Sequence, residues 1–349
     1  MTAATRPLRV AVVGTGFFSG FHLDAWSRVP DARIVAAAAQ SDRSRAEAKA
    51  AEYDVDEVYL DLDEMVEQAQ PDVIDIVTPP TTHLPIIRQL APHGVPLVVQ
   101  KPLAPNLDES IAVVEAAERH DTLLVMHENW RFRPWYREIK RLVTAGAIGE
   151  PEMIRFTCRP GDGRGPDAYL DRQPRFREME RGLVHEIGIH LIDIFRFLVG
   201  DVDRVLANLW RQNPVIAGED CAYVLFDFVG GEHGFFDGSR PNEHDAENLR
   251  LTIGDFLLEG SEGYIRHDGY GRMWIKPVKK PEDEHEYAFT TLGFGGDSVR
   301  LLNQHVADHL LDGAPIENTG RQFLANCYVE DAIYRSHDAQ AWIPLADYH

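Results

Sequence analysis

Residues 9–22 have the sequence RVAVVGTGFFSGFH, which combines a short apolar run with a glycine-rich segment. The apolar run 10–13 has the length of a buried strand, and Gly14 and Gly16 follow it directly. A strand, a tight turn and a helix start in this order point backbone N–H groups and a helix N-terminus at one spot, which suits a pyrophosphate. Ser19, a small residue, stands at the third glycine position of the Gly-x-Gly-x-x-Gly pattern that such turns often have. An ordinary glycine-rich turn has the same pattern, so the loop alone does not separate the two interpretations.

Composition limits the classes of protein that fit. A length of 349 residues exceeds what one hydrophobic core usually holds, so two domains are expected. The net charge of −21 argues against nucleic acid or an anionic membrane as partner. The three cysteines are far apart and lack metal-ligand spacing, which fits a reducing cytosol and predicts a cytoplasmic protein without a bound metal. No apolar run reaches the length of a membrane span, and residues 1–7 lack the apolar core of a signal peptide.

Short apolar runs alternate with helical patterns over roughly the first 125 residues. The expected strands are 10–13, 34–39, 73–77, 97–99 and 123–126, and the expected helices are 21–28, 43–53, 60–68, 83–93 and 107–119. Asn106 and Glu109 form a capping-box pattern at the start of the last helix. This alternation with short links predicts an α/β fold with a parallel, doubly wound sheet, which we assign to a first domain over residues 1–126.

The pattern changes in a second domain, residues 127–349. Helices are expected over 134–145, 183–199, 298–311 and 320–336, with long strands from residue 205 onward. Gly230-Gly231 separates the runs 222–228 and 234–236, and Gly254-Asp255 separates 249–253 from 256–259, so both are hairpin candidates. Consecutive strands of this kind predict a large, mostly antiparallel sheet.

Two polar motifs follow expected strands of the first domain. Thr78-Pro79-Pro80-Thr81-Thr82-His83 comes after one, and Gln100-Lys101-Pro102 comes after another. Ligands of open α/β sheets bind beyond the carboxyl ends of the strands, where a lysine can hydrogen-bond a substrate oxygen. A proline-rich turn and a surface lysine are the alternative interpretations.

Polar and aromatic residues are concentrated at residues 127–134, HENWRFRP, where the predicted pattern of secondary structure changes. Asn129, Trp130 and Arg131 are candidates to line a substrate pocket, and interdomain packing is an equal alternative.

The segment HEIGIHLID, residues 185–193, contains two histidines and two carboxylates. On an α-helix Glu186 and His190 are four residues apart and share a face. A carboxylate beside an imidazole can orient the ring and raise its basicity, which favours a general base. Two metal ligands or a structural pair are alternatives, although zinc would need a third ligand that nothing nearby supplies.

An arginine-rich stretch with interleaved acids lies between these motifs. Its arginines are Arg155, Arg159, Arg164, Arg172, Arg175, Arg177 and Arg181. A mixed-charge loop or subunit contact is favoured, and an anion site for an acidic substrate, with Arg164 as candidate, is the alternative.

Taken together, the motifs resemble the glucose–fructose oxidoreductase, inositol dehydrogenase and MocA (Gfo/Idh/MocA) family. Four motifs occur in the family's order. The first two are the glycine loop with its small residue and His22, and Thr78-Pro79 with His83. The other two are Gln100-Lys101-Pro102, with Gln for the family's Glu, and Glu186-Ile187-Gly188-Ile189-His190, with Glu for Asp. The resemblance covers nearly the whole chain. It implies a Rossmann domain and an α/β domain with an open sheet, whose exposed face commonly forms a homodimer or homotetramer.

The resemblance also implies an activity, namely hydride transfer between a hydroxyl carbon of a sugar or cyclitol and NAD(P). The products would be a lactone from an aldose or a ketone from a polyol. Lys101 would hydrogen-bond the reacting oxygen, His190 would take the hydroxyl proton, and Glu186 would assist it. A keto-sugar reductase, an NAD-dependent glycoside-cleaving enzyme and a non-catalytic cofactor-binding regulator are the alternatives.

The expected site residues follow from these motifs. Cofactor contacts are predicted for Gly14, Gly16, Phe17, Phe18, Gln40, Ser41, Arg43, Thr78, Pro79, His83, Gln100 and Lys101. Substrate contacts are predicted for Lys101, Asn129, Trp130, Arg131, Arg164, His185, Glu186 and His190. NAD and NADP both remain open, because Gln40 can hydrogen-bond a ribose 2′-OH, does not repel a 2′-phosphate, and has Ser41 and Arg43 beside it.

Overall fold

The computed structural model describes residues 6–39, 42–55, 57–171 and 173–348 and divides the chain into two compact units. The first unit runs to Asn129 and also includes Asp297–Ala325. The second consists of Trp130–Gly296 and the chain from Asn326 onward. Residues 297–325 thus belong to the first unit. The predicted division at residue 126 does not include them in the first domain.

The first unit is built on a six-stranded parallel sheet with the order β3-β2-β1-β4-β5-β6. Its strands are β1 (Leu8–Val13), β2 (Ala32–Ala38), β3 (Glu57–Tyr59), β4 (Val73–Ile76), β5 (Leu97–Gln100) and β6 (Leu124–His127). Most of their residues are buried, as expected of a sheet covered on both faces. The strand order reverses between β1 and β4, and open α/β sheets bind ligands at such a point. The predicted doubly wound sheet is confirmed.

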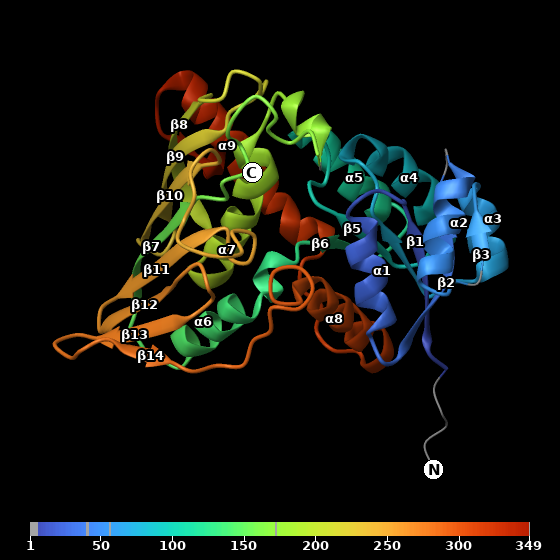
Figure 1. Ribbon diagram of the computed structural model, residues 1–349, viewed down its shortest axis with the longest axis horizontal. Helices are drawn as coiled ribbons and strands as arrows, with labels where there is room; N and C mark the ends of the chain where they lie inside the picture. The colour runs from blue at the N-terminus through green and yellow to red at the C-terminus, as the bar shows by residue number, and fades with distance from the viewer. Residues whose placement is uncertain (1–5, 40–41, 56, 172, 349) are drawn as a thin grey trace, which may run out of the picture. The chain divides into compact units, whose positions relative to one another are not determined.

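Helices flank this sheet (Figure 1). They are α1 (Ser19–Ser27), α2 (Arg43–Glu52), α3 (Leu62–Ala69), α4 (His83–Leu90), α5 (Leu107–Glu118) and α8 (Ser298–Asp312). Helix α8 packs against α1, and α4 packs between α3 and α5. The predicted capping box is present, because Asn106 accepts the Glu109 N–H at 2.9 Å and donates to the Glu109 carboxylate.

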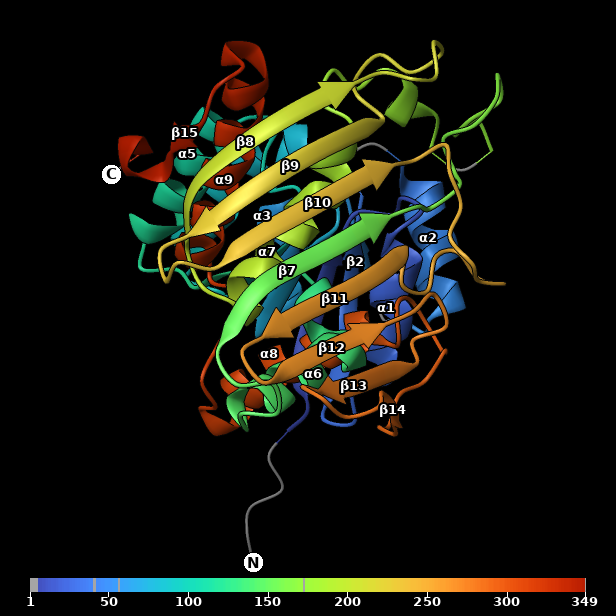
Figure 2. The same ribbon diagram turned by 90° about the vertical axis from the view of Figure 1, so that its left-hand side faces the viewer.

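The second unit contains a nine-stranded sheet with the order β14-β13-β12-β11-β7-β10-β9-β8-β15 (Figure 2). The strands are β7 (Pro151–Cys158), β8 (Val202–Trp210), β9 (Cys221–Phe228), β10 (His233–Ser239), β11 (Gly254–Gly260), β12 (Gly263–His267), β13 (Met273–Pro277), β14 (Asp283–His285) and β15 (Ile343–Pro344). All neighbours pair antiparallel except β7 and β10, which are parallel. The prediction of a large, mostly antiparallel sheet is confirmed.

One face of this sheet is open. Figure 2 shows it toward the viewer, with α6 (Pro134–Thr144), α7 (Ile189–Leu198) and α9 (Gly320–Ala339) behind the strands. Large apolar side chains remain exposed on two central strands, namely Met153 on β7 and Tyr223 and Leu225 on β9. Apolar surface of this kind is typical of a region that contacts a partner.

One predicted hairpin is correct and the other is wrong. Strands β9 and β10 pair across Gly230-Gly231. Residues 249–253 instead form turns, with Ile253 at φ +70°, and strand β11 begins at Gly254. A Cβ on Gly254 would lie 2.0 Å from the Thr157 carbonyl oxygen, so this glycine allows β11 to approach β7 rather than forming a hairpin turn. β11 forms its hairpin with β12.

Candidate active site

The glycine loop after β1 has the geometry that a dinucleotide requires. Gly14 has φ +113°, and a Cβ there would lie 2.6 Å from the Val77 carbonyl oxygen. Gly16 is exposed and a Cβ there would meet nothing within 4 Å. Ser19 Oγ donates to the Gly16 carbonyl at 2.7 Å where α1 begins, and the first turn of α1 carries no acid. The loop and the uncapped helix N-terminus therefore fit a pyrophosphate.

The other cofactor residues predicted near the first strands are partly described. Half of Phe17 is exposed, and Phe17 and Phe18 both contact the ring of Phe21 in α1. Arg43 is the first residue of α2 and lies 3.4 Å from Glu47 on the surface. Gln40 and Ser41 lie outside the described residues.

The loop after β4 is tied to the loop that carries Lys101. The buried ring of His83 has Nε2 3.0 Å from the Thr78 carbonyl oxygen and Nδ1 2.8 Å from the Leu103 carbonyl oxygen. Thr82 Oγ1 donates to the Pro79 carbonyl at 2.7 Å. His83 thus contacts the main chain of both loops and links them to each other.

Lys101 follows β5, and its main chain joins a buried series of hydrogen bonds. The Lys101 N–H donates to Gln100 Oε1 at 2.6 Å, and Gln100 Nε2 lies 2.9 Å from His22 Nε2. His22 Nδ1 lies 2.7 Å from Asp75 Oδ2, which also accepts from Trp26 Nε1 at 2.8 Å. Since β1, β4 and β5 are neighbours in the sheet, Gly14, Thr78 and Lys101 meet at the same edge.

The buried groups in this region have shifted pKa values. Burial opposes ionisation of Asp75, but His22 beside it holds the pKa of that carboxyl below its ordinary value. Burial, the largest cause, lowers the pKa of His127 to about 3, so His127 is neutral at working pH. The centroids of the His22 and His127 rings are 4.0 Å apart. The ionised carboxylate of Asp75 therefore lies beside a pair of closely spaced imidazoles, of which His127 is neutral.

The predicted general-base segment of the second unit begins with a π-helix, Val184–Gly188, before α7. The expectation of a regular α-helix over 183–199 is wrong at these five residues, because a π-turn accommodates an extra residue. Such turns occur frequently at functional sites. The pairing of Glu186 with His190 assumed a regular helix and remains a prediction.

The ring of His190 is held by an aromatic contact. It is 4% exposed and stacks on the Trp130 indole, with centroids 4.3 Å apart and planes within 4°. The Arg133 guanidinium carbon lies 3.7 Å from the centroid of the Trp130 ring. Trp130 thus contacts both His190 and a buried cation.

His185 has a carboxylate partner that the sequence did not reveal. Its Nδ1 lies 2.6 Å from Glu330 Oε1, and both side chains are buried. A carboxylate in this position fixes the orientation of an imidazole. Because 145 residues separate the two, no local pattern could have identified Glu330.

Three other predicted substrate residues have defined partners within their own units. Arg131 forms two hydrogen bonds with Asp193, at 2.6 and 2.8 Å. Asn129 Nδ2 donates to Ser298 Oγ at 2.6 Å. Arg164 donates to the Pro241 carbonyl and to Asn242 Oδ1.

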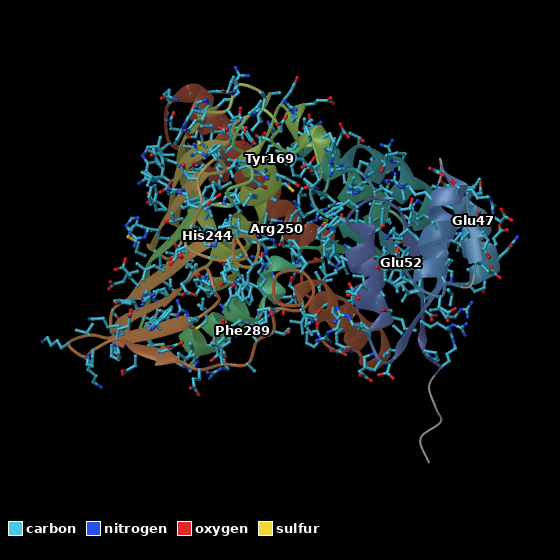
Figure 3. The ribbon with its side chains drawn as sticks, in the orientation of Figure 1. Glu47, Glu52, Tyr169, His244, Arg250 and Phe289 are labelled. Atoms are coloured by element: carbon cyan, nitrogen blue, oxygen red, sulfur yellow. The ribbon has the colours of Figure 1, made fainter. Side chains whose placement is uncertain are left out.

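The arginine-rich stretch is packed rather than extended. Tyr169, labelled in Figure 3, and Phe176 lie under the guanidinium of Arg240, which forms two hydrogen bonds with Asp162. Arg159 donates to the main-chain carbonyl of Asp237 at 2.9 Å and to its carboxylate at 2.6 Å. These contacts favour the mixed-charge loop over an anion site. Arg172 lies outside the described residues.

Two features are absent from the described residues. No three His, Cys, Asp or Glu side chains there are grouped to hold a metal ion. No helix within the same residues has both the length and the apolar character to cross a membrane.

A pyrophosphate-binding loop at the switch point of a doubly wound sheet is typical of dinucleotide-dependent proteins. Lys101, on the same edge of the sheet, points to an oxidoreductase. Comparison with known proteins agrees. The model of the oxidoreductase family with an NAD-binding Rossmann fold matches residues 8–128, and that of the GFO/IDH/MocA C-terminal domain matches residues 136–266. The chain belongs to the Gfo/Idh/MocA family, as its motifs predicted, and is an oxidoreductase with an NAD-binding Rossmann domain.

Individual relatives match along almost the whole chain. A D-apiose dehydrogenase of Paraburkholderia graminis is 36% identical, covering 96% of this chain and 89% of that protein. A D-apiose dehydrogenase of Rhizobium rhizogenes is 31% identical, covering 94% and 95%. A solved oxidoreductase from Agrobacterium radiobacter, in complex with NAD⁺, L-tartaric acid and magnesium, is 28% identical with a TM-score of 0.89, covering 98% of this chain and 99% of that one.

Proposed function

We propose that this protein is a sugar dehydrogenase that transfers a hydride from a hydroxyl-bearing carbon of its substrate to NAD(P)⁺. The first substrate to test is D-apiose, oxidised at the anomeric carbon to a lactone. The observation that carries the proposal is the position of Lys101, at the carboxyl end of β5, on the sheet edge that also carries the glycine loop. Two full-length relatives named as apiose dehydrogenases support the choice of sugar.

The chemistry assigns a role to each residue. Loss of a hydride from an alcohol gives a carbonyl only if the hydroxyl proton also leaves, so the site needs a base. His190 takes this proton, with Glu186 assisting, and the Lys101 ammonium group donates a hydrogen bond to the reacting oxygen. A bound nicotinamide supplies the hydride acceptor, while the protein orients the reactants.

The remaining predicted contacts take supporting roles. His185, oriented by Glu330, presents a polar ring to the substrate, and Arg164 contributes from the arginine-rich loop. Asn129, Trp130 and Arg131 act through the groups they contact, which are Ser298, His190 and Asp193 respectively.

Cofactor preference depends on Gln40 and its neighbours in sequence. An acid at the end of the second strand grips the ribose 2′-OH of NAD and repels a 2′-phosphate. Gln40→Asp should therefore shift preference toward NAD, measured as the ratio of kcat/KM for the two cofactors. An unchanged ratio would mean that Gln40 does not lie beside the ribose.

We also propose that the protein is a cytoplasmic homodimer or homotetramer that associates through the open face of the second sheet. The exposed apolar residues Tyr223 and Leu225 support this choice. The double variant Tyr223→Glu/Leu225→Glu should lower the mass measured by light scattering. Wild-type protein that is monomeric at micromolar concentration would contradict the proposal.

A substrate screen tests the function. Purified protein is offered aldoses, cyclitols and sugar acids with NAD⁺ and with NADP⁺, and nicotinamide absorbance is followed. Turnover that is lost in Lys101→Ala and in His190→Ala, with folding checked by circular dichroism, supports the assignment. Cofactor binding without turnover of any polyol in either direction would instead indicate a regulator.

A further inference from the structure

The hydrogen bonds around Gln100 have only one consistent direction. The Lys101 main-chain N–H can only donate, so the side-chain atom 2.6 Å from it must be the carbonyl oxygen of Gln100. The amide NH₂ then faces His22 Nε2 at 2.9 Å and can only donate. His22 Nε2 must therefore accept, which leaves the ring proton on Nδ1, 2.7 Å from Asp75 Oδ2.

The surroundings of His22 agree with a neutral ring. Four side chains face it, namely Asp75 from β4, Gln100 from β5, His127 from β6 and Phe18 from the glycine loop. Only Asp75 among these is charged, because burial keeps His127 neutral. All of His22 and Asp75 is shielded from solvent. The hydrogen-bonded series Asp75–His22–Gln100, which we call the relay, thus carries one negative charge.

We propose that Gln100 is a positioning residue for Lys101, which fixes the lysine main chain through the relay and locks His22 as its neutral Nδ1–H tautomer. The proposal rests on the proposed function insofar as Lys101 acts on the substrate. Gln100 uses both ends of its amide within the protein, so its effect on the cofactor site is indirect.

The Gln100→Glu variant gives a sharp contrast. A carboxylate at this position still accepts from the Lys101 N–H, but it cannot donate to His22 Nε2. When this side chain is ionised, its second oxygen accepts from His22 if His22 carries a proton on Nε2 as well, which makes an imidazolium between two carboxylates. The substitution should therefore place a proton on both ring nitrogens of His22.

Nuclear magnetic resonance of ¹⁵N-histidine-labelled protein tests the relay without turnover. In the wild type, His22, assigned by its loss in His22→Gln, should show the neutral Nδ1–H pattern at about pH 7. In Gln100→Glu it should show the imidazolium pattern at pH 7. An Nε2–H or doubly protonated His22 in the wild type would overturn the proposal.

Kinetics test the link to Lys101. Gln100→Met has a similar length but no hydrogen-bonding group, so kcat for the sugar should fall about tenfold, with little change in KM for the cofactor. Gln100→Glu should retain more activity than Gln100→Met, because a carboxylate still accepts from the Lys101 N–H. Gln89→Met in α4, where Gln89 bonds Asp63, is the matched control and should match the wild type.

The possible failures are distinguishable. If wild-type protein oxidises no polyol, the proposed function fails while the His22 spectrum still decides the relay. Equal kcat values in Gln100→Met and the wild type would refute the positioning role.

Discussion

The imidazole of His190 stacks on the indole of Trp130, with the two centroids 4.3 Å apart and the planes within 4°. A proposed general base is thus oriented by an aromatic surface as well as by its helix. Stacked aromatic pairs contribute about 0.5–1.5 kcal/mol beyond their buried area and restrict the orientation of both rings.

Trp130 variants test this contact. Trp130→Leu removes the aromatic surface and should lower kcat for the sugar about tenfold, because His190 is no longer held for proton transfer. Trp130→Phe keeps a ring in place and should lose less. Steady-state kinetics with the cofactor saturating make the comparison, and equal losses in the two variants would show that ring stacking does not matter.

Gly14 and Gly16 should respond differently to alanine. Gly14→Ala forces a side chain into a positive φ and against the Val77 carbonyl, so it should lower both the melting temperature and cofactor affinity. Gly16→Ala meets no protein atom, so its melting temperature should be that of the wild type. Its Kd for the dinucleotide, measured by calorimetry, should nevertheless rise at least about tenfold, because the backbone approaches the phosphates there. Unchanged affinity in Gly16→Ala would place the pyrophosphate elsewhere.

Glu219 caps the start of the π-helix from another part of the chain. Its carboxylate accepts from the Gly182 and Val184 N–H groups, each at 2.9 Å, and from the Tyr334 hydroxyl at 2.8 Å. Glu219→Ala leaves these buried donors without an acceptor and should reduce the free energy of unfolding by about 3 kcal/mol in urea titrations. The control Glu247→Ala, on the surface, should stay within about 0.5 kcal/mol of the wild type. A similar small effect at Glu219 would contradict the capping role.

His267 should make stability depend on pH. Burial, the dominant cause, lowers its pKa from the ordinary 6.5 to about 4. Between these values the unfolded chain binds a proton that the folded chain does not, so this contribution is complete above pH 6.5 and is lost as pH falls toward 4.

His267→Phe is the variant that tests this dependence. The ring of His267 stacks on Phe256, so phenylalanine keeps the shape and removes the titration. The fall in unfolding free energy between about pH 7 and about pH 4 should shrink by up to about 3 kcal/mol. Urea titrations across this range measure it, and an unaltered pH profile would count against a neutral buried His267.

The fold of the first unit could be predicted because its strands are buried on both faces. Runs such as residues 10–13 of β1 are apolar, so they stand out between helices. Strand β7 was missed because its open face carries Met153 and Arg155, and the arginines nearby suggested a loop. The alternation of buried Ile154, Phe156 and Cys158 was the pattern that could have identified it. The short strands β14 and β15 form only by pairing with neighbours, and no local pattern predicts them.

Only part of the candidate site could be predicted from the sequence. Lys101 and His190 belong to motifs, but the groups that hold them come from distant segments, as Glu330 does for His185. Asp75 is the exception, since a carboxylate within a buried apolar strand needs a partner and so indicates a polar network. The π-turn at 184–188 had no sequence counterpart that we can identify.

Deuterium transfer tests the central claim most directly. D-apiose labelled with deuterium at C1 is incubated with the enzyme and the preferred oxidised cofactor, and the reduced nicotinamide is analysed by mass spectrometry. The account predicts one deuterium per reduced nicotinamide in the wild type and no reduced cofactor with Lys101→Ala or His190→Ala. Reduced cofactor without the label, or labelling that survives both substitutions, would contradict it.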